Sequence, residues 1–160
     1  MKIINLLALL GIFWGSIASA QVASVDANTQ AEVQQTIEDF LYGASINDAS
    51  VHRSFWAPAL TYTSSRGTRY GYEQLISSLD DNAKLKPEQV TAWYSGEKFE
   101  FKGLGDAVLV NFTLVLSPVD GAQNSAGEAA KIERFHNTGV MMKVDGKWQA
   151  VNWNATAAIP

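Results

Sequence analysis

The chain has 160 residues, of which 47% are hydrophobic and 18% charged, and its formal net charge is −4. This length is typical of one domain with its own core, and the composition is not that of a disordered protein. An acidic chain lacks the basic surface that binds nucleic acid or anionic membranes, so we expect neither as a partner. The chain contains no cysteine, which excludes disulfide bonds and thiol chemistry.

Residues 1–20 have the three parts of a secretory signal peptide. Lys2 provides the charged start, residues 3–17 the apolar stretch and Ala18-Ser19-Ala20 the small-residue cleavage site. A membrane anchor is the alternative, but the apolar stretch is short for a bilayer span. We predict a periplasmic or secreted protein that has no membrane contact after signal removal. The mature chain would have 11 basic and 16 acidic residues, a formal charge of −5.

A polar leader at residues 21–28, which we expect to be flexible, precedes the first predicted helix. Thr29 and Glu32 match a capping box, in which each side chain satisfies an unpaired backbone N–H of the other residue. Apolar residues then recur every three or four positions, as expected for a helix with one buried stripe. The stripe comprises Val33, Ile37, Phe40, Leu41 and Ala44.

Two shorter helices are predicted to follow. Asn47 or Asp48 is suited to cap a helix that ends before Pro58, because proline cannot continue it. Apolar residues at helical spacing between positions 72 and 79 predict a third helix.

Most of the remaining chain is predicted to form strands. Residues 60–64 alternate and are rich in β-branched and aromatic side chains. Residues 90–102 predict two short strands, or one strand broken at Gly96. Residues 107–117 are apolar at nearly every position, as in a central buried strand. The small polar residues of 118–127 predict a flexible loop.

Residues 134–156 predict a long β-hairpin that turns at Asp145-Gly146. With these two as loop residues, Thr138 would face Trp153, and side chains would alternate between two faces. One face would carry Arg134, His136, Thr138, Val140, Met142, Val151 and Trp153, and the other Phe135, Asn137, Met141, Trp148, Ala150, Asn152 and Asn154. Both faces hold large apolar groups, so we expect helices to cover one face and a partner chain or more sheet to cover the other.

Helices followed by a strand meander predict a single α+β domain over residues 29–158. Long strands with glycines at intervals predict a strongly curved sheet that wraps around the first helix.

Two stretches, IEDFLYGASINDASVHRSFWAPALTYTSSRGTRYGYEQLISSL and TGVMMKVDGKWQAVNWNAT, resemble the NTF2-like superfamily, especially its SnoaL-like and DUF4440-type bacterial members. With the strands between them, the resemblance covers roughly residues 30–157. It implies a cone-shaped fold in which three N-terminal helices pack in a curved antiparallel sheet, with a pocket between helices and sheet. It also implies a homodimer formed through the outer face of the sheet.

The resemblance does not bring catalytic residues with it. Steroid-isomerase-like members use a carboxylate base on the first strand, and the matching position here is Thr63 or Tyr62. No Asp or Glu lies between Arg53 and Glu73, so we do not expect that proton abstraction. In DUF4440-type relatives the final strand often ends with a histidine, and the matching residue here is Asn154.

His136 and Tyr62 are the candidate catalytic residues. A partly buried imidazole acts as an acid, a base or a hydrogen-bond donor, although a histidine satisfied within the sheet is the interpretation we favour. Arg134 shares the predicted face of His136 and would bind a carboxylate or phosphate, unless it pairs with an acidic side chain of a neighbouring strand.

Aromatic residues are the candidate ligand contacts. Tyr42 and Tyr62 would offer phenol groups, and Trp56, Trp93 and Trp153 would line a pocket, with core packing as the alternative for each. His52 and His136 lack carboxylates at ligand spacing, and no glycine-rich phosphate loop follows a strand, so we expect no metal and no cofactor.

Three functions therefore remain open. The leading one is an exported domain that binds a small, partly apolar or aromatic ligand in the cone, without clear catalytic machinery. The second is a lyase or isomerase that uses His136 and Tyr62. The third is a dimeric interaction module with a vestigial pocket.

Overall fold

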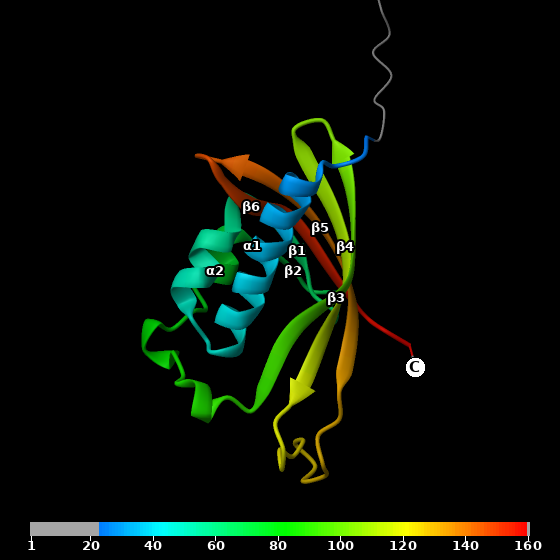
Figure 1. The fold of residues 1–160 in the computed structure, drawn as a ribbon. Coiled ribbons are helices and arrows are strands. Elements are labelled where there is room, and N and C mark those ends of the chain that lie inside the picture. Colours follow the sequence, from blue (N-terminus) through cyan, green and yellow to red (C-terminus); the bar gives the residue numbers. More distant parts are fainter. Residues whose placement is uncertain (1–22, 160) are drawn as a thin grey trace, which may run out of the picture.

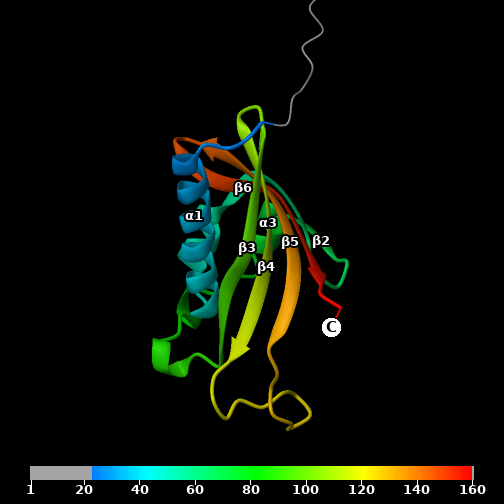
Figure 2. The same cartoon turned by 45° about the vertical axis from the view of Figure 1, so that its right-hand side comes forward.

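A computed structural model describes residues 23–159, so the predicted signal peptide lies outside the described residues. Helices α1, α2 and α3 lie in the hollow of one curved sheet (Figures 1 and 2). The helices are α1 Ala27–Ser45, α2 Ala49–Phe55 and α3 Tyr72–Ile76, with 3-10 turns at Asp81–Ala83 and Pro87–Gln89. The strands are β1 Trp56–Thr63, β2 Arg69–Gly71, β3 Ala92–Leu104, β4 Ala107–Pro118, β5 Glu133–Val144 and β6 Lys147–Ala157.

The six strands are ordered β2-β1-β6-β5-β4-β3. β3 to β6 form an antiparallel meander, whereas β1 runs parallel to β6. The α+β fold with a curved sheet is confirmed, and the β1–β6 pair is its one departure from the antiparallel pattern among the described strands. Parallel neighbours need a long connection, and here the whole β3–β5 meander separates them in sequence.

The stripe predicted for α1 is the part of the helix that enters the core. Val33 and Ile37 are fully buried, and Phe40 and Leu41 nearly so. The predicted capping box is not formed, because Asp26 caps the helix instead. Its carboxylate accepts hydrogen bonds from the backbone N–H groups of Asn28 and Thr29, at 3.1 and 3.0 Å, and these bonds lower the Asp26 pKa.

Residues 23–28 of the predicted leader lie within the described part of the chain. Ala23 and Gly103 form a β-bridge, in which Gly103 N donates to Ala23 O at 2.9 Å. Ala27 and Asn28 already belong to α1. The described part of this segment therefore contacts the C-terminal end of β3.

The second helix begins as predicted at Asp48, whose side chain accepts from the backbone N–H of Ser50. It ends at Phe55, and β1 follows immediately, with Pro58 inside the strand. Among the described residues, no helix is both long and apolar enough to span a membrane.

The hairpin turn at Asp145-Gly146 is confirmed, with φ angles of 51° and 78°. The predicted register beyond it is wrong, however. Met141 pairs with Ala150 but Val140 pairs with Asn152, so Val151 is bulged out of the ladder. Such an extra residue reverses the face of every side chain that follows it in the strand.

The bulge moves Trp153 to the inner face of the sheet, where it pairs with Gly139 rather than Thr138. A Cβ atom on Gly139 would lie 2.5 Å from the Trp153 ring, so only glycine leaves room for the indole. Packing of this large ring against the core determines the register, and the simple count of alternating positions misses it.

Candidate ligand-binding site

A cavity of about 500 Å³ lies between the helices and the inner face of the sheet. Its wall is formed by helices α1, α2 and α3, the segment after α3, and strands β1, β3, β4, β5 and β6. It is lined by Phe40, Leu41, Ala44, Asn47, His52, Trp56, Tyr62, Ser65, Leu75, Leu79, Tyr94, Leu114, Phe135, Asn137, Trp153 and Ala155. None of these described lining residues is an Asp, Glu, Lys or Arg. The volume and the mostly apolar lining fit a small organic molecule.

Stacked aromatic rings form one wall of the cavity. Tyr62 stacks on Trp56 with ring centroids 5.7 Å apart, and on Tyr70 with ring centroids 5.9 Å apart. Trp153 meets Trp56 edge to face at 5.7 Å. Each ring is held by another ring, so this wall presents a preformed surface to a flat apolar ligand.

Asn137 anchors the Trp153 indole at the back of the cavity. Its Oδ1 accepts a hydrogen bond of 2.8 Å from Trp153 Nε1, and its Nδ2 donates to the Phe135 carbonyl at 3.2 Å. Asn137 is only 3% exposed, so these bonds replace the water it has lost. They fix the orientation of the indole.

His52 brings a titratable group to the cavity. Its Nδ1 accepts a hydrogen bond of 3.4 Å from Trp56 Nε1, and the edge of its ring contacts Phe40 at a centroid distance of 5.1 Å. Burial lowers the His52 pKa below its ordinary value, and the Asp48 carboxylate opposes this shift. At neutral pH the imidazole is therefore uncharged, with its proton on Nε2 because Nδ1 accepts.

Tyr62 is kept as a phenol. Burial raises its pKa, and the neighbouring hydroxyls of Tyr70 and Tyr94 raise it further. The Tyr62 hydroxyl can therefore donate or accept a hydrogen bond at neutral pH, but it is a poor source of phenolate.

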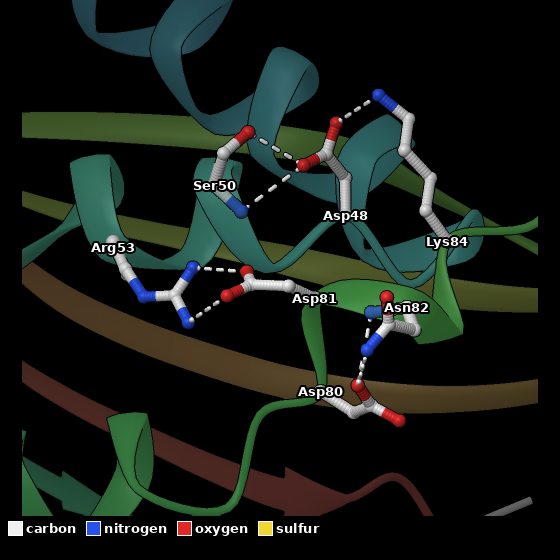
Figure 3. A network of polar contacts seen from close by, with 7 residues as sticks. All are labelled: Asp48, Ser50, Arg53, Asp80, Asp81, Asn82 and Lys84. Carbon is white, nitrogen blue, oxygen red and sulfur yellow. Dashed lines mark hydrogen bonds and ion pairs between the residues drawn. The ribbon is translucent and has the colours of Figure 1, made fainter.

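Helix α3 and the segment after it close one side of the cavity, where they contribute Leu75 and Leu79, respectively, to the lining. Two ion pairs attach this segment to the α1–α2 region (Figure 3). Arg53 on α2 binds both carboxylate oxygens of Asp81, and Lys84 Nζ lies 2.6 Å from Asp48 Oδ2. The hydrogen bonds from Lys84 and Ser50 lower the Asp48 pKa to about 2.

A second hollow, of about 540 Å³, differs from the cavity because its lining includes charged residues. It lies between α1, α2 and the β5–β6 turn, and its lining includes Glu32, Asp39, Lys143 and Lys147. Glu32 pairs with Lys143 at 3.0 Å and accepts from Trp148 Nε1 at 2.9 Å. Glu32 thus has partners across the hollow instead of completing the predicted capping box.

The structure divides the predicted site residues into two groups. Tyr62, Trp56 and Trp153 line the cavity. Tyr42 and Trp93 do not; they stack on each other at 5.7 Å, and Tyr42 is 53% exposed.

Arg134 and His136 lie on the outer face of the sheet, because they alternate along β5 with Phe135 and Asn137, which line the cavity. Both are exposed, and Arg134 Nε lies 3.9 Å from Glu97 Oε2. Tyr62 and His136 are on opposite sides of the sheet, so the pair expected for a lyase or isomerase does not meet in one cavity.

Sequence reasoning missed His52. Its position in α2, four residues before Trp56 at the C-cap of that helix, is a usable signal for contact between the two side chains. Which side of the helix faced a cavity could not be read from a helix of seven residues. Among residues 23–159, no three His, Cys, Asp or Glu side chains come together as a metal site would require.

Comparison with known proteins identifies the fold. No protein-family model matches the chain, and no curated protein matches its sequence. Solved structures do match. An NTF2-like superfamily protein from Salmonella enterica serovar Typhimurium aligns over 84% of this chain and 94% of its own, with a TM-score of 0.65 and 14% identity.

Two further structures show how varied the proteins of this fold are. A candidate scytalone dehydratase from Novosphingobium aromaticivorans aligns over 82% of this chain and 85% of its own, with a TM-score of 0.65 and 9% identity. The association domain of C. elegans CaMKII aligns over 81% and 95%, with a TM-score of 0.62 and 12% identity. The chain therefore has the NTF2-like fold. Identities this low establish the fold alone, and the SnoaL-like or DUF4440-type subtype remains a prediction.

Proposed function

We propose that this protein binds a small, uncharged, partly apolar molecule in the cavity of its cone. The observation that carries the proposal is a cavity of about 500 Å³ with stacked aromatic rings and no charged residue among the described lining. Apolar pockets with a few polar groups are the usual form of small-molecule sites. His52, Tyr62 and Asn137 are the polar groups that would orient the ligand.

The uncharged fluorophore 6-propionyl-2-(dimethylamino)naphthalene provides a direct test, because its emission increases and shifts to the blue in an apolar pocket. We expect saturable binding to the wild type. Leu114→Trp, which places a larger ring in the cavity, should strongly weaken it. Leu109→Trp is the matched control, since Leu109 lies on the outer face of the same strand. Equal binding by both variants would place the fluorophore elsewhere and reject the proposal.

We also propose that the protein is exported, on the basis of the signal-peptide features of residues 1–20. Expression of the full chain followed by cell fractionation and intact mass measurement tests this. A mature protein that begins near Gln21 outside the cytoplasm is the expected result. Retention of Met1 in the cytoplasmic fraction would contradict it.

A second proposal concerns self-association through the outer face of the sheet. On that face Leu109 of β4 pairs with Val140 of β5. In the next row Ala107 of β4 pairs with Leu104 of β3 and with Met142 of β5, which are 43% and 38% exposed. Contiguous exposed apolar side chains are typical of protein contacts. The structural likeness to a CaMKII association domain is consistent with an NTF2-like domain that assembles.

Sedimentation velocity tests this second proposal. A concentration-dependent dimer is expected for the wild type, and Met142→Lys should shift it to monomer because it places a charge within the apolar group. Gln123→Lys, in the β4–β5 loop, adds the same charge away from the sheet. A wild type that stays monomeric at high micromolar concentration would reject the dimer.

A further inference from the structure

We propose that the imidazole of His52 selects the ligand, by donating a hydrogen bond from Nε2 to a carbonyl-type oxygen on an uncharged, flat aromatic molecule. This inference rests on the proposed function, because it names the chemical class of the molecule in the cavity. It assigns recognition to a residue of α2.

The imidazole ring of His52 has a fixed orientation. Nδ1 accepts a hydrogen bond from Trp56 Nε1, and Phe40 packs edge to face against the imidazole. Trp56 is in turn stacked on Tyr62 and is 4% exposed. An imidazole held on two sides in this way has one proton position and little rotational freedom, so its remaining donor is preorganised.

The Nε2 donor of His52 is available to a ligand. The neutral ring carries its proton on Nε2, and no hydrogen bond joins Nε2 to another of the described residues. No fully enclosed side-chain nitrogen or oxygen lacks a partner in the described part of the chain, so Nε2 is not sealed in the core. His52 is only partly buried and borders both the cavity and a smaller hollow next to it, whose lining includes Asp80.

The cavity and the smaller hollow differ in charge, because Asp80 lines the hollow and none of the described residues that line the cavity is an Asp, Glu, Lys or Arg. The carboxylate that acts on His52 is Asp48, which already accepts from Lys84 Nζ and from the Ser50 hydroxyl. Among the described residues that line the cavity, none is a lysine or arginine that would neutralise an anion, and none is a carboxylate that would neutralise a cation. Burying an uncompensated charge in such a site is costly, so the complementary ligand is uncharged.

The shape of the cavity suits a flat ligand. Trp56, Tyr62 and Trp153 offer flat surfaces within the same cavity as His52. A flat ligand stacks on these rings, while its oxygen accepts the proton of Nε2. A buried donor that loses water without gaining an acceptor is penalised, so the site disfavours a pure hydrocarbon of the same shape.

Three probes of similar size test this assignment by titration calorimetry. They are 2-acetonaphthone, its isosteric alkene 2-isopropenylnaphthalene, and the anion 2-naphthoate. The wild type should bind the ketone about tenfold more tightly than the alkene, as expected for one hydrogen bond to a buried donor, and bind the anion most weakly.

His52→Phe keeps an aromatic ring against Phe40 but has no donor, so it should bind ketone and alkene equally. His52→Gln keeps both a donor and an acceptor and should retain part of the preference. If His52→Phe does not fold, long-range ¹H–¹⁵N spectra of the wild-type imidazole serve instead. The Nε2 signal should shift on addition of the ketone and not on addition of the alkene.

The outcomes distinguish the role of His52 from the binding function of the cavity. Equal wild-type affinity for ketone and alkene, or an unchanged preference in His52→Phe, would overturn the role of His52 and leave the binding function intact. Tightest binding of the anion would overturn both, because the proposed function is binding of an uncharged molecule. Failure of the wild type to bind any of the three probes would overturn both.

Discussion

The two faces of β5 lie in different environments, although neighbouring residues form them. The inner face carries Phe135, Asn137, Gly139 and Met141, which pack in the core or line the cavity. The outer face carries Arg134, His136, Thr138 and Met142, all of them exposed. A change of one position along the strand therefore moves a side chain between a solvent-exposed surface and a cavity wall. Neighbouring substitutions in this strand serve as matched controls for each other.

The largest difference between the faces should appear when Met141 and Met142 are each replaced by alanine. Met141 is fully buried in the core, whereas Met142 is 38% exposed. We expect Met141→Ala to lower the free energy of unfolding by about 3 kcal/mol, from lost burial and the space left behind. Met142→Ala should change it by no more than about 0.5 kcal/mol. Urea denaturation of both variants measures this, and equal losses would contradict the assignment of faces.

A smaller difference is expected between Asn137→Ala and Thr138→Ala. The first removes the acceptor of the Trp153 indole in a buried site, which should cost about 2 kcal/mol. Thr138 Oγ1 donates to Asn111 Oδ1 on the exposed face, where water replaces the lost partner. Its removal should have little effect. The near-ultraviolet circular dichroism of the tryptophans should change in Asn137→Ala alone; retention of that signal would show that Asn137 does not orient Trp153.

The two histidines extend the comparison to pH. Burial lowers the His52 pKa in the folded protein below the ordinary value of 6.5, so at mildly acidic pH the unfolded chain binds more protons. The His52 contribution therefore makes the folded state less stable as pH falls below about 6.5, until the folded-state pKa is passed.

His52→Phe should remove this part of the pH dependence of thermal unfolding, whereas His136→Phe should retain it. Trp56 fluorescence gives a second measurement, because protonation of Nδ1 ends its role as acceptor for the indole. A stability profile that His52→Phe leaves unchanged would mean that His52 is not held neutral by burial.

The smallest effect is expected for the outer residues that the sequence suggested as functional. Arg134→Ala and His136→Ala should leave both the unfolding free energy and the affinity for 2-acetonaphthone close to wild-type values. Arg134 is half exposed in a pair 3.9 Å long, a geometry that contributes little stability. A marked loss of ketone affinity in His136→Ala would show that the ligand is bound on the outer face instead.

Local patterns were sufficient for much of the architecture. The buried stripe of α1, the Asp48 cap, the Asp145-Gly146 turn and the strand order along the chain each depend on residues close in sequence. Tyr62, Trp56 and Trp153, which the sequence offered as candidate ligand contacts, line the cavity, and their role in binding stays a prediction. The predicted antiparallel sheet was nearly complete, because hairpin pairing follows directly from turn chemistry.

What sequence alone determined is therefore the three helices, the long strands and the presence of an aromatic interior, whereas the short β2 and the 3-10 turns were not predicted. Only the tertiary structure decided which residues share the cavity, and the reason lies in contacts between distant segments. The Val151 bulge allows Trp153 to pack over Gly139, and this reverses the face on which the indole lies. The position of α2 against the sheet brings His52, and not His136, to the cavity. Both depend on how large side chains fill a common core, which no local pattern encodes.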